Sequence, residues 1–187
     1  MRLYLIRHSL TDGNLKKRYI GTTDEPLCEA GIELLRDRNY PKAKALYVSP
    51  MLRCRQTAAL IYPGQEYEVV EDLRECDFGL FENKNYEELS DCPQYQEWVD
   101  SGGTLAFPGG ESREAFQNRT LGAFERILRG CGRSQVQTAA LVIHGGSIMS
   151  IMERYAYPPG EYYDYQVGNG EGYELEFETG RSCRISV

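Results

Sequence analysis

Two short apolar runs in this chain each lead directly to a histidine. The first, Arg2–Ile6, contains no turn residue and is followed by Arg7 and His8, and the second, Thr138–Ile143, is followed by His144. Continuous apolar runs of this length are typical of strands buried on both faces of a parallel sheet. Because ligands bind at the carboxyl ends of the strands in open α/β sheets, both histidines are predicted to lie at a ligand-binding edge.

A plainer interpretation exists for each histidine taken alone, since a histidine at a strand end can simply hydrogen-bond a loop. The chain has 2 histidines in 187 residues, and both have the same setting. His8 stands beside Arg7, and His144 precedes Gly145 and Gly146. Small residues at the start of a helix let backbone N–H groups approach an anion. The pair therefore favours a shared anion site over two separate structural roles.

Length, charge and cysteine pattern exclude several classes of protein. At 187 residues the chain is expected to form one domain over residues 1–187. A net charge of -7 argues against a nucleic-acid partner, whose binding surface would be basic. The first predicted strand begins at residue 2, with no signal-peptide pattern before it and no membrane-spanning run after it. We therefore expect a cytoplasmic protein without a membrane partner.

The 6 cysteines are irregularly spaced and form no C-x-x-C pair. This pattern fits neither a zinc knuckle nor a small disulfide scaffold, so reduced thiols are expected. No cluster with metal-ligand spacing is present, and we predict neither a metal nor another cofactor.

A helix start in the middle of the chain makes one arginine informative. Ser49 and Pro50 follow a predicted strand, Ala45–Val48, and suit the N-cap and first position of a helix. Arg53 would then lie in the first turn, where the helix dipole disfavours a cation by about 0.3–1 kcal/mol. A cation there suggests either a bound anion or an ion pair with a nearby carboxylate.

Candidate acids follow a third predicted strand, Glu66–Val70. If the backbone around Glu75 and Asp77 is extended, the two side chains point to the same side. The alternative is a solvated acidic loop paired with Arg74. On the N-terminal side of these elements, Cys28–Arg38 is predicted to be a helix whose inner face carries three apolar residues, Ala30, Leu34 and Leu35.

The segment 81–110 lacks a clean period and is rich in aromatic residues, so we predict a lid-like insertion over the sheet edge. Its rings could equally form a satellite core or a substrate wall. Glu111–Leu128 is predicted to be the longest helix, with an inward stripe comprising Ala115, Phe116, Ala123, Phe124, Ile127 and Leu128. Three edge strands are expected in the C-terminal part, at Asp164–Val167, Tyr173–Glu178 and Cys183–Val187.

Several segments resemble, in order, the motifs of the histidine phosphatase superfamily, the phosphoglycerate mutase-like proteins. Arg7–Asn14 (RHSLTDGN) is similar to R-H-G-x-[ST]-x-x-N, with Ser9 in place of glycine. The other similar segments are Gly21–Gly31 (GTTDEPLCEAG), Ser49–Ala58 (SPMLRCRQTA), Leu73–Gly79 (LRECDFG), Gly110–Arg119 (GESREAFQNR) and His144–Gly146 (HGG). The resemblance implies a three-layer α/β/α sandwich with a mostly parallel sheet and an antiparallel edge.

The resemblance also implies a role for each matching residue. His8 would be the nucleophile that becomes phosphohistidine, and Glu75 would be the proton donor and then the base that activates water. Arg7, Arg53 and His144 would surround the phosphate. The implied assisting residues are Asn14, Gly21, Thr22 and Gly145. Neighbouring arginines would keep His8 neutral, whereas they would oppose the raised pKa that Glu75 needs in order to donate.

The implied function is hydrolysis of a small phosphorylated metabolite by a phosphomonoesterase. The segments Gly79–Glu82 and Gly109–Ser112 are most similar to the alpha-ribazole phosphatase branch, which would make alpha-ribazole 5'-phosphate the substrate. One alternative is a phosphoglycerate mutase, which uses the same kind of site. Another is a phospho-ligand-binding or regulatory protein in which Ser9 has silenced the chemistry.

Overall fold

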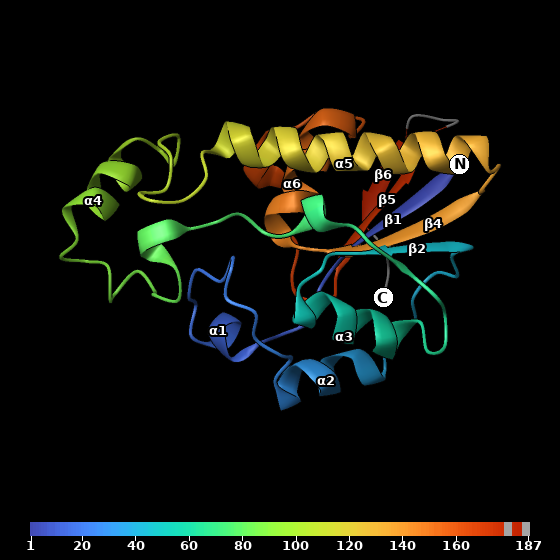
Figure 1. The fold of residues 1–187 in the computed structure, drawn as a ribbon, viewed down its shortest axis with the longest axis horizontal. Helices are drawn as coiled ribbons and strands as arrows, with labels where there is room; N and C mark the ends of the chain where they lie inside the picture. Colours follow the sequence, from blue (N-terminus) through green and yellow to red (C-terminus); the bar gives the residue numbers. More distant parts are fainter. Residues whose placement is uncertain (178–180, 185–187) are drawn as a thin grey trace.

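A six-stranded sheet forms the centre of the computed structural model, which describes residues 1–177 and 181–184 (Figure 1). The strand order is β3-β2-β4-β1-β5-β6. The strands are β1 (Arg2–Arg7), β2 (Ala45–Val48), β3 (Glu68–Val69), β4 (Thr138–Ile143), β5 (Gly172–Glu176) and β6 (Arg181–Arg184). The first four run parallel, whereas β5 is antiparallel to β1 and β6 to β5. The mostly parallel sheet with an antiparallel edge is confirmed.

Helices cover both faces of the sheet (Figure 1). On one face lie α2 (Glu29–Arg36) and α3 (Leu52–Ile61), and on the other lie α5 (Arg113–Arg133) and α6 (Gly145–Tyr155). Shorter elements are α1 (Asp12–Leu15), α4 (Pro93–Asp100) and the 3-10 helices η1 (Glu71–Leu73), η2 (Gly79–Phe81) and η3 (Tyr162–Tyr165). Among the described residues, no helix is both long and apolar enough to cross a membrane.

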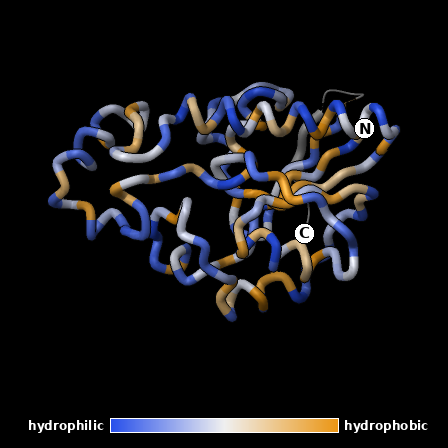
Figure 2. Tube along the Cα trace, viewed as in Figure 1, coloured by the Kyte–Doolittle hydropathy of each residue, from blue (hydrophilic) through white to orange (hydrophobic). Residues whose placement is uncertain are grey.

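The two cores follow from strand alternation. Along β1, Leu3 and Leu5 face α5 and α6, whereas Tyr4 and Ile6 face α3. Figure 2 shows hydrophobic residues concentrated along these central strands. Burying one such leucine or isoleucine contributes about 1.5–3 kcal/mol. The buried side chains of β1 and β4 therefore hold these two strands in place, and with them the residues that follow their carboxyl ends.

Three sequence expectations are wrong in detail. The α3 helix begins at Leu52 with Met51 as its N-cap, so Ser49 and Pro50 precede the helix. Ala30 is exposed, because α2 packs through Gly31 and Leu35. The predicted strand Asp164–Val167 instead overlaps the 3-10 helix η3.

Other boundaries shift. The third strand is shorter than expected, and Ala115 is exposed on α5. β5 confirms the edge strand predicted at Tyr173–Glu178 as far as the structure describes it. β6 overlaps the strand predicted at Cys183–Val187 at residues 183–184 and begins two residues earlier, and residues 178–180 and 185–187 lie outside the described residues.

The segment 81–110 contains α4, which projects beyond the edge of the sheet (Figure 1). Its rings pack on one another: Trp98 lies 5.2 Å from Phe107 between ring centroids, and Phe81 is fully buried beneath them at 5.9 Å from Trp98. The segment thus has a small core of its own. Trp98 and Phe107 also line a cavity, and their role as a substrate wall stays a prediction.

Candidate active site

Pairing of β1 with β4 brings the two histidines together. Arg7 lies opposite Ile143 in the parallel register, so the residues that follow, His8 and His144, emerge side by side. Their ring centroids are 5.2 Å apart with an interplanar angle of 65°. His8 is 4% exposed and His144 is 0% exposed. The two strand ends therefore bring the histidines together, as the sequence predicted.

The His8 ring is oriented by the backbone. Its Nδ1 lies 2.7 Å from the carbonyl oxygen of Ser9. Because a carbonyl oxygen can only accept, Nδ1 carries the proton and Nε2 keeps its lone pair. Burial, followed by the charges of Arg53 and Arg7, holds the pKa of His8 well below its usual value. His8 is therefore a neutral imidazole whose Nε2 carries a free lone pair.

His144 is the N-cap residue of α6, and the Ser49 hydroxyl lies 2.7 Å from its Nε2. Cys54 Sγ lies 3.5 Å from the same nitrogen. Burial and the Arg53 charge hold the pKa of His144 well below its usual value, so this ring is neutral too. Sequence reasoning assigned Ser49 to a helix cap and missed its contact with His144.

Arg53 is fully buried near the start of α3. Its Nη1 donates to the carbonyl of Thr23 at 2.8 Å, and its Nη2 donates to the carbonyls of Gly21 at 3.0 Å and Ile20 at 3.3 Å. The Nε of Arg53 is buried and has no hydrogen-bond partner in the described structure. The loop carbonyls therefore hold the guanidinium in place while one N–H stays available.

Arg7 has the same pattern. Its Nη1 donates to the carbonyl of Val167 at 2.7 Å, and its buried Nε has no partner among the described residues. Burial lowers the pKa of Arg7, and the Glu75 charge opposes that effect. Within the described residues, neither Arg7 nor Arg53 forms an ion pair with a carboxylate. A half-buried and a fully buried arginine, each with a buried N–H that has no partner among the described residues, have the charge and donors that suit an anion.

Asn14 joins this site through a residue that sequence reasoning missed. Its Oδ1 accepts from Asn169 Nδ2 at 3.0 Å and from the backbone N–H of Thr11 at 3.3 Å. Asn169 Nδ2 also donates to the carbonyl of His8 at 3.1 Å. Because Oδ1 of Asn14 already accepts two hydrogen bonds, the side-chain group of Asn14 that can bind a further partner is its Nδ2 amide, as a donor. Asn169 lies between two glycines, a sequence typical of a turn, and this local pattern gives no signal for the contact with Asn14.

Glu75 approaches the site from the opposite side. It is 9% exposed, and its carboxylate accepts from the backbone N–H of Cys76 at 3.0 Å and of Gly146 at 3.4 Å. A Cβ at Gly146 would lie 2.7 Å from Glu75 Oε1, so glycine permits this approach. Burial raises the pKa of Glu75, although the Cys76 N–H and the Arg53 charge oppose the rise. The balance that the sequence left open is therefore a pKa above the usual carboxyl value.

An ion pair between Arg119 on α5 and Glu111, which precedes that helix, holds the segment that carries Glu75. Arg119 Nη2 lies 2.7 Å from Glu111 Oε2, and Arg119 Nη1 donates to the carbonyls of Asp72 at 2.8 Å and Arg74 at 3.0 Å. Glu111 Oε2 also accepts from the backbone N–H of Asp77 at 3.0 Å. The pair therefore fixes the backbone on both sides of Glu75.

The carboxylates of Asp77 and Glu82 accept hydrogen bonds from the backbone of nearby turns and loops. Asp77 Oδ1 accepts from the N–H of Gly79 at 2.9 Å, so Asp77 closes a turn and does not form a pair of acids with Glu75. Glu82 Oε1 accepts from the N–H groups of Gly21 and Thr23, both at 2.8 Å. Thus Glu82 orders the loop whose carbonyls hold Arg53.

Gly21 contacts the predicted site residue Arg53 through its backbone. Both backbone groups of Gly21 are used within the protein, because its N–H bonds Glu82 and its carbonyl bonds Arg53. A Cβ at Gly21 would lie 1.9 Å from the carbonyl oxygen of Cys76, so glycine is needed for close packing here. Thr22 is exposed. Gly145, in contrast, occupies the first position of α6, beside Arg7.

Ser9 points away from the anion site. It is fully buried, its Oγ donates to the carbonyl of Gly31 at 2.6 Å, and its N–H donates to Thr57 Oγ1 at 3.0 Å. The side chain therefore ties the His8 loop to α2 and does not crowd the histidines.

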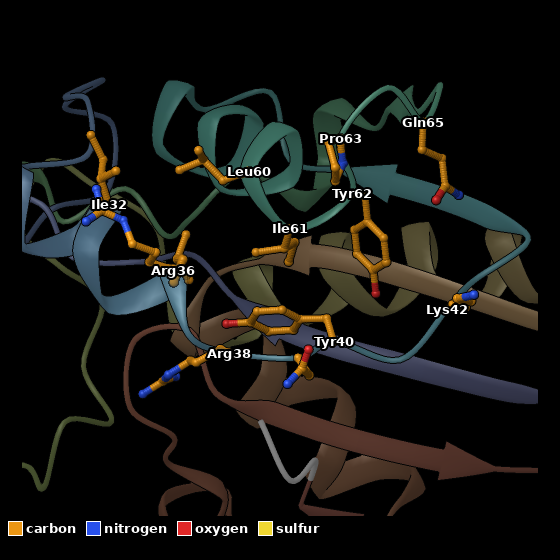
Figure 3. Close-up of a pocket in the computed structure, with 12 residues that line it drawn as sticks. Ile32, Arg36, Arg38, Tyr40, Lys42, Leu60, Ile61, Tyr62, Pro63 and Gln65 are labelled. Carbon is orange, nitrogen blue, oxygen red and sulfur yellow. The ribbon is translucent and has the colours of Figure 1, made fainter.

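Two cavities meet at Glu75, Gly146 and Met149. One, of about 280 Å³, includes Arg7 and Gly145 in its lining. The other, of about 200 Å³, is lined mainly by aromatic rings. A separate cavity of about 600 Å³ between α2 and α3 is lined by residues such as Tyr40 and Tyr62 (Figure 3) and includes none of the predicted site residues. The described residues contain no group of three or more His, Cys, Asp or Glu side chains arranged to hold a metal.

The chain is similar in sequence and in structure to several known proteins. The sequence model of the histidine phosphatase superfamily (branch 1) matches residues 3–186. Phosphoserine phosphatase 1 of Hydrogenobacter thermophilus is 30% identical over 152 residues, 77% of this chain and 71% of that protein. Adenosylcobalamin/alpha-ribazole phosphatase of Salmonella typhi is 28% identical over 91% of this chain and 87% of that protein. The structure of phosphoglycerate mutase from Thermus thermophilus aligns with a TM-score of 0.75 and 30% identity, covering 100% of this chain and 99% of that one.

Proposed function

The chain belongs to the histidine phosphatase superfamily (branch 1), and we propose that it hydrolyses small phosphomonoesters by passing the phosphoryl group through His8. It is a metal-independent phosphomonoesterase. In the first step, the lone pair of His8 Nε2 forms a bond to phosphorus as the ester P–O bond breaks. Glu75 gives its proton to the leaving oxygen. The products are the free alcohol and a phosphohistidine.

Water completes the cycle in the second step. The Glu75 carboxylate takes a proton from water as the water oxygen bonds to phosphorus, and the P–N bond to His8 breaks. Inorganic phosphate leaves, and Glu75 is again protonated for the next turnover. The raised pKa of Glu75 suits both halves of this cycle, because the same group must hold the proton and then release it.

The observation that carries the proposal is the pair of buried, unpartnered Nε–H groups of Arg7 and Arg53 beside the nucleophilic ring of His8, within the part of the chain that the structure describes. A phosphoryl group there would satisfy both donors and offset the charges of the half-buried Arg7 and the fully buried Arg53. Asn14, the Gly145 N–H and His144 are proposed as further partners of its oxygens. We propose that Gly21 allows its loop to pack closely against the backbone of Cys76, and that the exposed Thr22 lies at the outer edge of the site.

The substrate is proposed to be a small phosphorylated metabolite. The relatives carry the names phosphoserine phosphatase and adenosylcobalamin/alpha-ribazole phosphatase. Alpha-ribazole 5'-phosphate is our first candidate. We also propose that residues 81–110 act as a partial cover of the site within a single domain. A cytoplasmic location, with neither nucleic acid nor membrane as partner, is proposed from the cysteine pattern and the net charge of -7.

Turnover of p-nitrophenyl phosphate in EDTA at mildly acidic pH tests the enzyme class. We expect steady release of phosphate, which would cease in His8→Ala and persist in the matched control Asp77→Asn. Binding of phosphate without turnover would instead support a phospho-ligand-binding protein.

The acceptor is tested by incubating the protein with 3-phosphoglycerate and measuring free phosphate and 2-phosphoglycerate in one sample. Water as acceptor predicts phosphate as the main product. Rapid interconversion with little free phosphate would establish a mutase.

A further inference from the structure

The cavity of about 200 Å³ on the far side of Glu75 from Arg7 is walled mainly by rings. Its aromatic lining residues are Tyr19, Phe78, Trp98, Phe107, Phe116, Tyr162 and Tyr163. We propose that this cavity binds a planar heteroaromatic ring on the alcohol half of the substrate. This inference rests on the function proposed above, because it places the leaving alcohol next to Glu75.

The position of Glu75 defines the direction of the substrate. Glu75 and Gly146 border both this cavity and the cavity that contains Arg7. With phosphate held on the Arg7 side, the oxygen that receives the proton of Glu75 lies at the boundary. The carbon skeleton attached to that oxygen then extends into the aromatic cavity. Pockets for whole drug-sized ligands measure about 300–1,000 Å³, so this cavity suits one ring system of a substrate.

The walls are ordered before any ligand arrives. Ring centroids lie 5.0 Å apart for Phe78 and Phe107, 5.2 Å for Trp98 and Phe107, and 5.3 Å for Tyr19 and Phe78. Tyr95 stacks on Trp98 at 6.2 Å with an interplanar angle of 17°. Rings held in this way present fixed faces and edges, and a flat ring that pairs with them gains free energy beyond that of area burial.

Trp98 adds a polar requirement. Its Nε1 is buried and has no acceptor within the part of the chain that the structure describes. A buried donor without a partner costs free energy, and a ligand acceptor would remove that cost. A ring nitrogen or a ring oxygen can supply the acceptor, whereas a plain hydrocarbon ring cannot.

The one cation among the described lining residues is already engaged. The Arg113 guanidinium carbon lies 4.0 Å from the centroid of the Tyr162 ring, and Arg113 Nη2 lies 3.2 Å from Glu153 Oε1. Phosphoserine and phosphoglycerate each carry a carboxylate that would need a cation at this place. The paired state of Arg113 therefore disfavours both relative to a neutral aromatic alcohol.

Phosphate esters of matched alcohols test the proposal without a leaving-group bias. We compare 2-naphthylmethyl, quinolinylmethyl and cyclohexylmethyl phosphate, all esters of primary alcohols, together with O-phosphoserine. In the native protein we expect kcat/KM for the two aromatic esters to exceed that for the cyclohexyl ester by about tenfold, equivalent to about 1.4 kcal/mol. The quinolinyl ester is expected to be the best of the four.

Variants then assign the preference to the cavity. Phe107→Leu should reduce the aromatic preference, and Trp98→Phe, which keeps a ring but removes the N–H, should remove the advantage of quinolinyl over naphthyl. Val99→Ala is the matched control, since Val99 lies on α4 beside Trp98 but is 44% exposed and outside the lining. It should leave all four rates unchanged.

Equal kcat/KM for the aromatic and cyclohexyl esters in the native protein would overturn the proposal, as would a preference for O-phosphoserine. Failure of the phosphatase function itself gives a different result, namely no phosphate release from any ester, p-nitrophenyl phosphate included.

Discussion

Replacing Glu75 with Gln is expected to slow phosphoryl transfer from esters of poor leaving groups. Glutamine fills the same buried volume, and its amide oxygen can keep the 3.0 Å hydrogen bond from the N–H of Cys76, whereas the 3.4 Å bond from Gly146, which goes to the other carboxylate oxygen, is lost. The substitution therefore removes the proton donor together with one long hydrogen bond. General acid catalysis contributes about 10²–10⁴-fold, so we expect a loss of that size for an alkyl phosphate. This corresponds to about 2.7–5.4 kcal/mol of transition-state stabilisation.

Single-turnover kinetics measure this step apart from hydrolysis of the phosphoenzyme. With p-nitrophenyl phosphate the loss should be much smaller, because p-nitrophenolate leaves without a proton. For an alkyl phosphate, the native rate should fall as pH rises through the raised pKa of Glu75, since the acid form is the donor. That decline should be absent in Glu75→Gln. The reasoning is refuted if Asp77→Asn, whose carboxylate only closes a turn, slows the reaction more than Glu75→Gln does.

Three further substitutions test the supports of the site. Arg53→Lys should lower kcat/KM by about 10²–10³-fold, because it removes a fixed donor to the charge of the transition state. It should also abolish the rise in melting temperature that inorganic phosphate is expected to cause in scanning fluorimetry, and an unchanged rise would show that phosphate binds elsewhere. Asn169→Ala removes the contact with Asn14 and should lower kcat by about tenfold, the worth of roughly one hydrogen bond, and a native kcat would make that contact irrelevant to catalysis. Ser9→Gly removes the bond to Gly31 and should lower the free energy of unfolding in urea by about 1 kcal/mol while activity is retained; a large gain in activity would instead show that Ser9 restrains the chemistry.

The central part of the site could be predicted because strand ends determine it. Once β1 and β4 are adjacent and parallel, the residues after them must lie side by side, so His8 and His144 follow from two apolar runs in the sequence. Arg53 was informative for a similar reason, since a cation near a helix start is unusual. Although α3 begins at Leu52, Arg53 still lies in the first turn of the helix, where a cation is unfavourable.

The supporting contacts could not be predicted, because they join residues far apart in the sequence. Ser49 lies against His144, and Asn169 lies against Asn14 and the His8 carbonyl. The local sequence pattern suggests a helix cap for Ser49 and a turn for Asn169, so it gives no reason to expect either contact. The Asp77 interpretation was wrong for a related reason: the two-residue period of an extended strand does not apply where the chain turns at Gly79.

The measurement that tests the account most directly is chemical trapping of the phosphoenzyme. The protein is mixed with a labelled phosphomonoester, quenched at high pH within one turnover, and digested for peptide mapping. We predict an acid-labile, base-stable phosphate on His8, more abundant in Glu75→Gln when a good leaving group is used, and absent in His8→Ala together with turnover. A phosphate on any other residue, or full turnover by His8→Ala, would contradict the account.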